Sequence, residues 1–93
     1  MRVWVELKGP LAFLAGGERF PLDLEEGADV LTAIRALCEE RPELSSAIFD
    51  AETGDPRTNF LILLDGRDVD VLSGLATRLG EGQVLTLVPL IRL

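Results

Sequence analysis

One helix constrains the fold of this chain more than any other feature. A single long stretch places apolar residues at the three- and four-residue intervals that put them on one face of a helix. The stripe consists of Val30, Ile34, Leu37, Cys38 and Arg41. Asp29 precedes the stripe, where a carboxylate is a good N-cap, and Pro42 follows it and ends a helix. The remainder of the fold must then be built mainly from strands and turns.

Five shorter stretches have the features of β-strands. They are residues 2–7, 19–24, 60–64, 67–71 and 84–88. In the first two, apolar and polar side chains alternate with period two, which is typical of a strand with one buried face. Pro21 places the second stretch at a sheet edge, because proline has no backbone N–H to donate. Asp65-Gly66, after the third stretch, is a strong signal for a tight hairpin.

The predicted elements follow in the order β-β-α-β-β-β. This order does not fit a doubly wound α/β fold, in which strands and helices alternate regularly. It fits an α+β fold in which one main helix packs on one face of a mixed sheet of about five strands. Residues 1–93 show no repeat, linker or low-complexity segment, so we interpret them as one domain. The second face of the sheet must meet water or a partner.

Composition excludes several classes of function. Nine Lys and Arg stand against sixteen Asp and Glu, for a formal charge of −7, so the chain has no basic patch for nucleic acid. There is no histidine and one cysteine, Cys38, which removes the usual general base and the Ser-His and Cys-His nucleophile pairs. We therefore predict no enzyme activity, no cofactor and no metal site.

Apolar runs such as residues 60–64 are far shorter than the ~20 residues that span a bilayer. The beginning of the sequence also lacks the charged-then-apolar pattern of a secretory signal. We expect a cytoplasmic protein that does not enter a membrane.

Two acidic groups resemble metal sites only loosely. They are Asp65, Asp68 and Asp70 near the hairpin, and Asp50, Glu52 and Asp55 in the loop before it. Neither group has a histidine or the convergent ligands of a calcium loop. We interpret them as a solvated hairpin and a solvated loop, and Cys38 as part of the core.

Several motifs that occur in order resemble the MoaD/ThiS family. The stretch GPLAFLAGGERFPLDLEEGADVLTAIRALCEERPEL is similar to the N-terminal half of that family. The stretch DGRDVDVLSGLATRLGEGQVLTLVP is similar to its hairpin, its Leu-x-Gly-Leu-x-Thr loop and its last strand, which ends at proline. The resemblance covers nearly the whole chain and implies a ubiquitin-like β-grasp fold.

The same resemblance implies a role for the C-terminal tail. Family members end in Gly-Gly, and an activating enzyme uses ATP to convert the terminal carboxylate into a thiocarboxylate that donates sulfur. The corresponding tail of this sequence is Pro89, Leu90, Ile91, Arg92 and Leu93. Leu93 occupies the place of the first glycine and the second has no counterpart, so we expect the sequence as written not to be activated.

The face of the sheet opposite the helix is the second predicted site. Period-two alternation and the family pattern place one set of side chains outward. They are Trp4, Leu61, Leu63, Val84, Thr86 and Val88. An apolar group of this kind is typical of an interface, with Trp4 as its anchor. The resemblance implies an activating enzyme or a large synthase-like subunit as the partner, and the alternative is a homodimer through this face.

Two functional hypotheses remain. The first is a non-catalytic subunit of sulfur transfer or molybdopterin-cofactor metabolism that binds its partner through the open sheet face and the tail. The second is a true sulfur carrier whose tail is extended or processed to Gly-Gly. The residues do not separate molybdopterin, thiamine and tRNA thiolation pathways.

Overall fold

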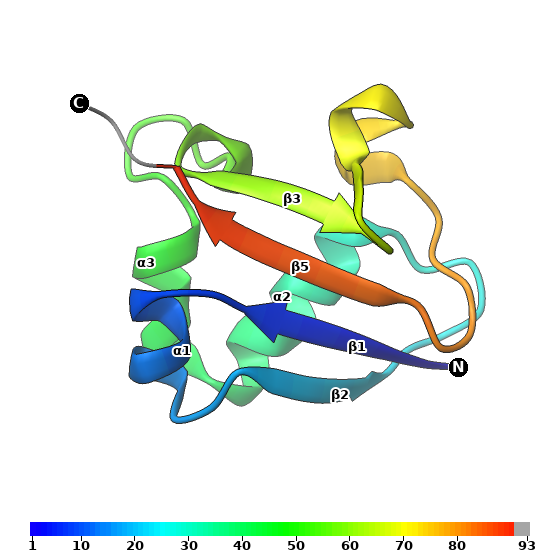
Figure 1. Cartoon of the computed structure of the whole chain (residues 1–93), viewed down its shortest axis with the longest axis horizontal. Helices are drawn as coiled ribbons and strands as arrows, with labels where there is room; N and C mark the ends of the chain where they lie inside the picture. The colour runs from blue at the N-terminus through cyan, green and yellow to red at the C-terminus, as the bar shows by residue number, and fades with distance from the viewer. Residues whose placement is uncertain (91–93) are drawn as a thin grey trace.

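A five-stranded mixed sheet forms the framework of the protein in the computed structural model, which describes residues 1–90. The strands are β1 (Arg2–Leu7), β2 (Arg19–Asp23), β3 (Phe60–Leu64), β4 (Arg67–Asp68) and β5 (Val84–Pro89). Their order across the sheet is β2-β1-β5-β3-β4, with β1 and β5 parallel and the other neighbours antiparallel (Figure 1). This is the ubiquitin-like β-grasp arrangement, so the predicted fold class is confirmed.

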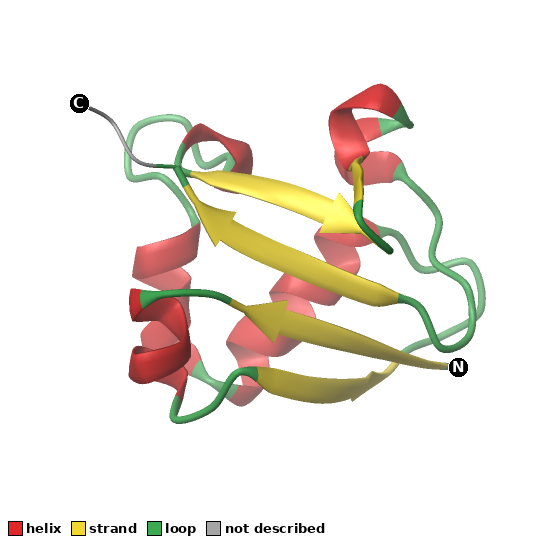
Figure 2. Cartoon of the chain, viewed as in Figure 1, coloured by secondary structure: helices red, strands yellow, loops and turns green. Residues whose placement is uncertain are grey.

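One face of the sheet is covered by α2 (Val30–Glu40), which crosses behind the strands in Figure 2. The other helices are short: α1 (Pro10–Ala15) and α3 (Ser45–Ile48), with 3-10 turns η1 (Pro42–Leu44), η2 (Pro56–Thr58), η3 (Val69–Val71) and η4 (Gly74–Ala76). No helix among residues 1–90 is long and apolar enough to cross a membrane.

A hydrophobic core lies between the sheet and α2. Each long strand alternates buried and half-exposed or exposed residues, and α2 buries the apolar stripe that its spacing predicts. Fully buried side chains include Val3, Val5, Leu7, Ile34, Leu37, Ile62, Leu85 and Leu87. Each contributes roughly 1.5–3 kcal/mol relative to exposure to water, so this layer fixes which sheet face points inward.

Helix α2 begins and ends where the sequence predicts. The Asp29 carboxylate accepts hydrogen bonds from the backbone N–H of Thr32 at 2.9 Å and from its hydroxyl at 2.8 Å. At the other end, Arg41 is the C-cap and Pro42 begins η1. The guanidinium of Arg41 lies 3.9 Å from the ring centroid of Phe20, which ties the helix end to β2.

The hairpin between β3 and β4 also agrees with its sequence signal. Asp65 and Gly66 have φ values of 46° and 83°, the left-handed pair that a type I′ turn requires. The Asp65 carboxylate accepts from the backbone N–H of Val84 at 2.8 Å and from the amide of Gln83 at 3.2 Å. The turn is thereby attached to the start of β5.

Three predicted strand ends are wrong. The strand expected over residues 19–24 stops at Asp23. The strand expected over residues 67–71 stops after Asp68, because the Asp68 carboxylate accepts from the backbone N–H of Asp70 at 2.9 Å and starts η3. Asp68 and Asp70 therefore do not share the face of one strand. The last strand extends one residue beyond Val88, since Pro89 pairs with Phe60.

Candidate protein-binding surface

The open face of the sheet gathers all six of the outward side chains predicted from the sequence. We call them the open-face cluster: Trp4, Leu61, Leu63, Val84, Thr86 and Val88. Each is partly exposed and alternates along its strand with a buried core residue. Five of the six are apolar, so the uncovered face has a hydrophobic strip along β3 and β5 that reaches Trp4 on β1.

Strand register makes this cluster continuous across three strands. Its members are paired directly across β1–β5 and β5–β3. The paired residues are Trp4 and Val84, Leu63 and Thr86, and Leu61 and Val88. Side chains of directly opposed residues on one face contact each other, so the cluster forms one surface from β1 to β3.

Trp4 is held from the side of β2. It lies opposite Pro21 in the antiparallel pair, and the guanidinium of Arg19 is 5.2 Å from the centroid of the indole ring. A cation over an aromatic ring at an exposed site stabilises its position by about 0.5–1 kcal/mol. The indole is therefore partly oriented before any partner binds.

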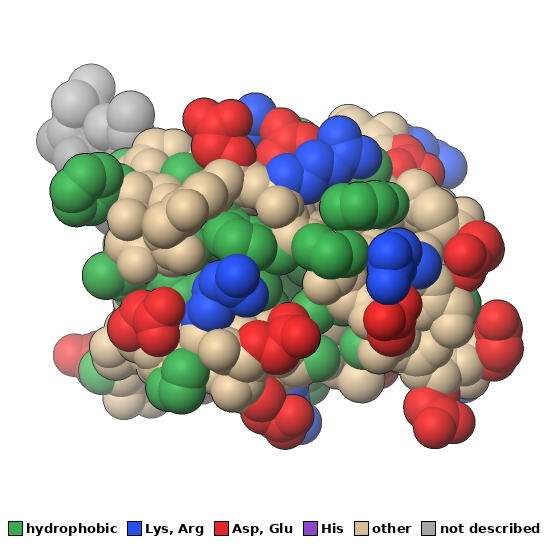
Figure 3. Space-filling view, turned by 90° about the horizontal axis from the view of Figure 1, so that it is seen from below, with side chains coloured by type: hydrophobic (Ala, Val, Ile, Leu, Met, Phe, Trp, Pro, Cys, Tyr) green, Lys and Arg blue, Asp and Glu red, His purple; other side chains and the backbone are tan. Residues whose placement is uncertain are grey.

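Charged side chains flank the apolar strip. Arg2 pairs with Asp23 at 3.0 Å and Lys8 pairs with Glu6, all of them on or beside β1 and β2. Seen from the β2 side, acidic and basic groups are interspersed and hydrophobic side chains surface between them (Figure 3). An apolar centre with a charged rim is the usual composition of a protein interface.

The predicted tail begins inside β5. Pro89 is the last residue of the strand, and the Leu90 N–H donates to the Asn59 carbonyl at 2.9 Å. The tail therefore starts at the end of the sheet where β5 finishes, next to Val88 of the open-face cluster. The predicted tail residues Ile91, Arg92 and Leu93 lie outside the described residues.

The acidic groups near the hairpin have structural partners. Asp65 holds the turn, Asp68 caps η3, and Asp70 accepts from the guanidinium of Arg57 at 3.1 Å. Within residues 1–90, no group of three or more Asp, Glu, His or Cys side chains is arranged to hold a metal ion.

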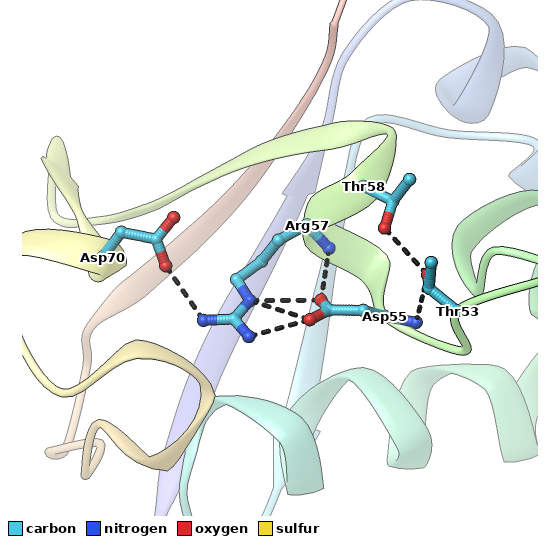
Figure 4. A network of polar contacts seen from close by, with 5 residues as sticks. All are labelled: Thr53, Asp55, Arg57, Thr58 and Asp70. Atoms are coloured by element: carbon cyan, nitrogen blue, oxygen red, sulfur yellow. Dashed lines mark hydrogen bonds and ion pairs between the residues drawn. The ribbon is translucent and has the colours of Figure 1, made fainter.

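A polar network around Arg57 was missed by the sequence reasoning. The guanidinium donates to both carboxylate oxygens of Asp55, at 2.7 Å for the closest contact, and to Asp70 (Figure 4). The hydrogen bonds from Arg57 hold the pKa of the Asp55 carboxyl below its usual range. Thr53 and Thr58 bond to each other beside this network, at 2.8 Å. The network around Arg57 joins the loop before β3 to η3. Its only local signal in the sequence is the Asp-x-Arg spacing of Asp55 and Arg57.

Cys38 lies in the core, as predicted. Its side chain belongs to the stripe of α2 that faces the sheet, and burial raises the pKa of the thiol. A thiol with a raised pKa is mostly protonated near neutral pH and is a poor nucleophile. Cys38 therefore does not add chemistry to the open face.

No protein-family profile matches the chain, and no curated protein sequence matches it significantly. Solved structures do match. SAMP1 from Haloferax volcanii superposes with a TM-score of 0.86 at 25% identity, over 98% of this chain and 97% of that one. The small archaeal modifier protein 1 from Methanosarcina acetivorans gives 0.81 at 28% identity, over 97% and 93%.

A third match comes from a two-protein assembly. The complex of subunits 1 and 2 of the molybdopterin-converting factor from Helicobacter pylori contains a chain that superposes with a TM-score of 0.62 at 25% identity. The alignment covers 99% of this chain and 97% of that one. The similarity to these proteins therefore extends over the whole chain.

Proposed function

We propose that this ubiquitin-like β-grasp protein of the MoaD/ThiS type acts in the cytoplasm as a non-catalytic, partner-binding subunit of sulfur transfer or molybdopterin-cofactor metabolism. The open-face cluster and the tail that follows Pro89 dock together onto a partner enzyme. That partner is an activating enzyme or a large synthase-like subunit. The observation that carries the proposal is the continuous apolar surface centred on Trp4.

Leaving the open-face cluster in water costs free energy. Only one side of the sheet is covered by α2, and the other exposes aromatic and branched aliphatic side chains in one strip. Burying apolar surface contributes about 25 cal/mol per Å², so a partner that covers the strip gains affinity without rearranging the strands. Trp4, supported by Arg19 and Pro21, has the residue type and the rigidity of an interface hot spot.

The solved assembly from Helicobacter pylori supports a protein partner for a chain of this fold. A homodimer through the open-face cluster is the alternative use of the same surface. In that case two copies would bring their negative charges together, whereas a partner of opposite charge is favoured by attraction.

Isothermal titration calorimetry measures the binding of this protein to the candidate partner, an activating enzyme or a large synthase-like subunit. Trp4→Glu and Leu63→Glu place a carboxylate in the centre of the apolar strip, and we expect each to weaken binding by at least about tenfold, since buried hot-spot changes cost 2 kcal/mol or more. Phe13→Glu is the control, because Phe13 is 91% exposed on α1, away from the face. Circular dichroism confirms that each variant is folded. Wild-type affinity in Trp4→Glu would remove the open-face cluster from the binding site.

The second candidate function is a true sulfur carrier or protein modifier. It is favoured by the similarity to the archaeal modifier proteins, which spans nearly the whole chain. In this function the terminal carboxylate attacks ATP, pyrophosphate leaves, and a sulfur donor then displaces AMP to give a thiocarboxylate. It requires a tail that ends in Gly-Gly.

Intact-mass spectrometry separates the two functions. The protein is incubated with the activating enzyme, ATP and a sulfur donor, and the same chain extended by Gly-Gly serves as the comparison. The binding-only function predicts no mass change for the sequence as written. A gain equal to the replacement of one oxygen by sulfur in that sequence would establish the carrier function instead.

A further inference from the structure

Arg19 differs from the other charged residues of β1 and β2, because it has no carboxylate partner. Its place opposite Glu6 puts it on the open face of the sheet, and its guanidinium lies 5.2 Å from the centroid of the Trp4 indole. Among residues 1–90, no carboxylate oxygen lies within ion-pair distance of this guanidinium. A cation that no acid neutralises therefore stands beside the aromatic anchor of the open-face cluster.

The carboxylates beside Arg19 in the sheet register already have other partners. Glu6 lies directly opposite Arg19, but its ion pair is with Lys8. The hydrogen bond from Lys8 is the main cause of the lowered pKa of the Glu6 carboxyl, and Arg19 acts on that pKa only through its charge. Asp23, at the end of β2, pairs with Arg2 at 3.0 Å. The sheet thus leaves the Arg19 guanidinium available to a group from outside.

A partner that covers the Trp4 indole must also cover part of the Arg19 guanidinium, because the two groups are in contact. Arginine keeps its charge at neutral pH, and burying a charge without a partner is strongly unfavourable. A carboxylate removes this cost, since its two oxygens accept parallel hydrogen bonds from the N–H groups of one guanidinium. The chemistry of the covering surface is therefore constrained at this point.

We propose that the partner enzyme presents an Asp or Glu carboxylate to Arg19, at the edge of the apolar pocket that receives the Trp4 indole. This inference rests on the proposed function, since it names the chemistry of the surface to which the open-face cluster binds. The paired charge fixes the orientation of the partner, whereas the apolar strip supplies most of the buried area.

The net charge of −7 does not oppose this contact. Exposed charges farther away than the Debye length, about 8 Å at physiological salt, are largely screened. The two carboxylates on neighbouring positions, Glu6 and Asp23, are neutralised by Lys8 and Arg2. A partner that is basic elsewhere on its surface is still favoured at long range, so one local carboxylate and an overall attraction are compatible.

Surface plasmon resonance with the activating enzyme or the large synthase-like subunit immobilised tests the contact. Arg19→Gln removes the charge and Arg19→Glu reverses it. Arg67→Gln and Arg67→Glu are the matched controls, because they change the net charge by the same amounts. Arg67 is exposed and lies opposite the buried Leu64, so it belongs to the other face of the sheet.

We expect Arg19→Gln to weaken binding by about tenfold or more, mainly through faster dissociation, as for other charge-assisted hydrogen bonds in an interface. Arg19→Glu should weaken it several-fold further, because two carboxylates then face each other. The Arg67 variants should change the association rate only. Circular dichroism confirms that each variant is folded.

The two Arg19 variants also separate a contact with the partner from mere support of Trp4. Both variants remove the cation from the indole, so a supporting role predicts the same affinity for Arg19→Gln and Arg19→Glu. Equal affinities of these two variants, or equal effects at positions 19 and 67, would overturn the proposal.

Trp4→Glu in the same series distinguishes the failure of this inference from the failure of the proposed function. Binding that is lost in Trp4→Glu but unchanged in both Arg19 variants would keep the open face as the binding site and overturn only the carboxylate contact. A wild type that binds neither enzyme, or that forms a dimer which Trp4→Glu separates, would overturn the proposed function and this inference together.

Discussion

At the scale of single residues, Asp29 fixes the start of the main helix. Its carboxylate accepts from both the backbone N–H and the hydroxyl of Thr32. Asp29→Ala removes both bonds, and we expect it to lower the free energy of unfolding by about 1 kcal/mol, the usual cost of losing an N-cap. Urea denaturation at neutral pH measures this loss.

Asp29→Asn is the control for that experiment, because asparagine is an equally good N-cap without a charge. We expect this variant to unfold at nearly the wild-type urea concentration at neutral pH. A loss as large in Asp29→Asn as in Asp29→Ala would mean that the charge, and not the cap, stabilises the helix.

Arg57 joins two segments that are distant in sequence. Its guanidinium bonds to Asp55 through two nitrogens and to Asp70 through a third, and the side chains of Arg57, Asp55 and Asp70 are 37%, 31% and 55% exposed. Double-mutant cycles with alanine should give a coupling of about 0.5–1 kcal/mol for Arg57 with Asp55 and less than about 0.5 kcal/mol with Asp70, because solvent screens the more exposed pair.

The cycle also controls for a second role of Asp55, which accepts from the backbone N–H of Arg57 at 2.8 Å. That bond is present whatever side chain occupies position 57, so it cancels from the coupling energy. Equal couplings for the two carboxylates would contradict the bidentate geometry.

At the scale of elements, the sequence predicts those whose signals are local. Asp29 and Pro42 bound α2, and Asp65-Gly66 defines the hairpin turn, because each acts on its own backbone. The prediction that the strand after this turn continues beyond Asp68 is wrong. The Asp68 carboxylate accepts from the backbone N–H of Asp70 and so competes with the sheet for that donor. Period-two alternation carries no information about such a bond.

Strand β2 forms an exposed edge of the sheet, and its register with β1 shows how that edge is protected. Leu24 exchanges hydrogen bonds with Met1, just before β1, and the Glu18 carbonyl accepts from the Leu7 N–H. In this register the backbone of alternate residues, Pro21 among them, faces outward. Proline offers no N–H to a second chain at the middle of this edge. The edge prediction made from Pro21 is confirmed by the strand order.

Pro21→Val restores an N–H and adds a β-branched side chain at this edge. We expect several-fold more light scattering on prolonged incubation at high concentration, because edge strands then pair between copies. Pro21→Lys restores the same N–H but adds a charge that opposes pairing, so it should scatter like the wild type. Scattering of Pro21→Val at the wild-type level would mean that the missing N–H does not protect the edge.

At the scale of the whole molecule, alternation predicts which side chains share the open face but not how they are arranged. The order of strands brings Trp4 beside Val84 and Leu63 beside Thr86, although these residues are far apart in the sequence. The apolar cleft lined by Leu11, Ala47 and Leu90 was not predicted for the same reason. Its walls come from α1, α3 and β5, and no local pattern places these together.

The carboxylates of the whole chain make its stability sensitive to acid. Folding lowers the pKa of Glu6, Asp23, Asp29, Asp50 and Asp55. A folded-state pKa below the unfolded value contributes stability that is complete above the unfolded pKa, about 4 for these groups, and is lost as the pH falls through the folded values. We therefore expect the urea midpoint to fall steadily below about pH 4.

The cause of each shift predicts how salt acts on this acid response. For Asp29 and Asp50 the largest cause is a backbone hydrogen bond, from Thr32 and Thr53 respectively, and for Asp23 it is the hydrogen bond from Arg2. Salt at about 1 M weakens the exposed pair of Asp23 with Arg2 but leaves the backbone hydrogen bonds to Asp29 and Asp50 in place. The fall in the urea midpoint should thus persist in about 1 M NaCl. A midpoint that no longer depends on pH in that salt would show that long-range charge, and not these hydrogen bonds, links folding to the protonation of the carboxylates.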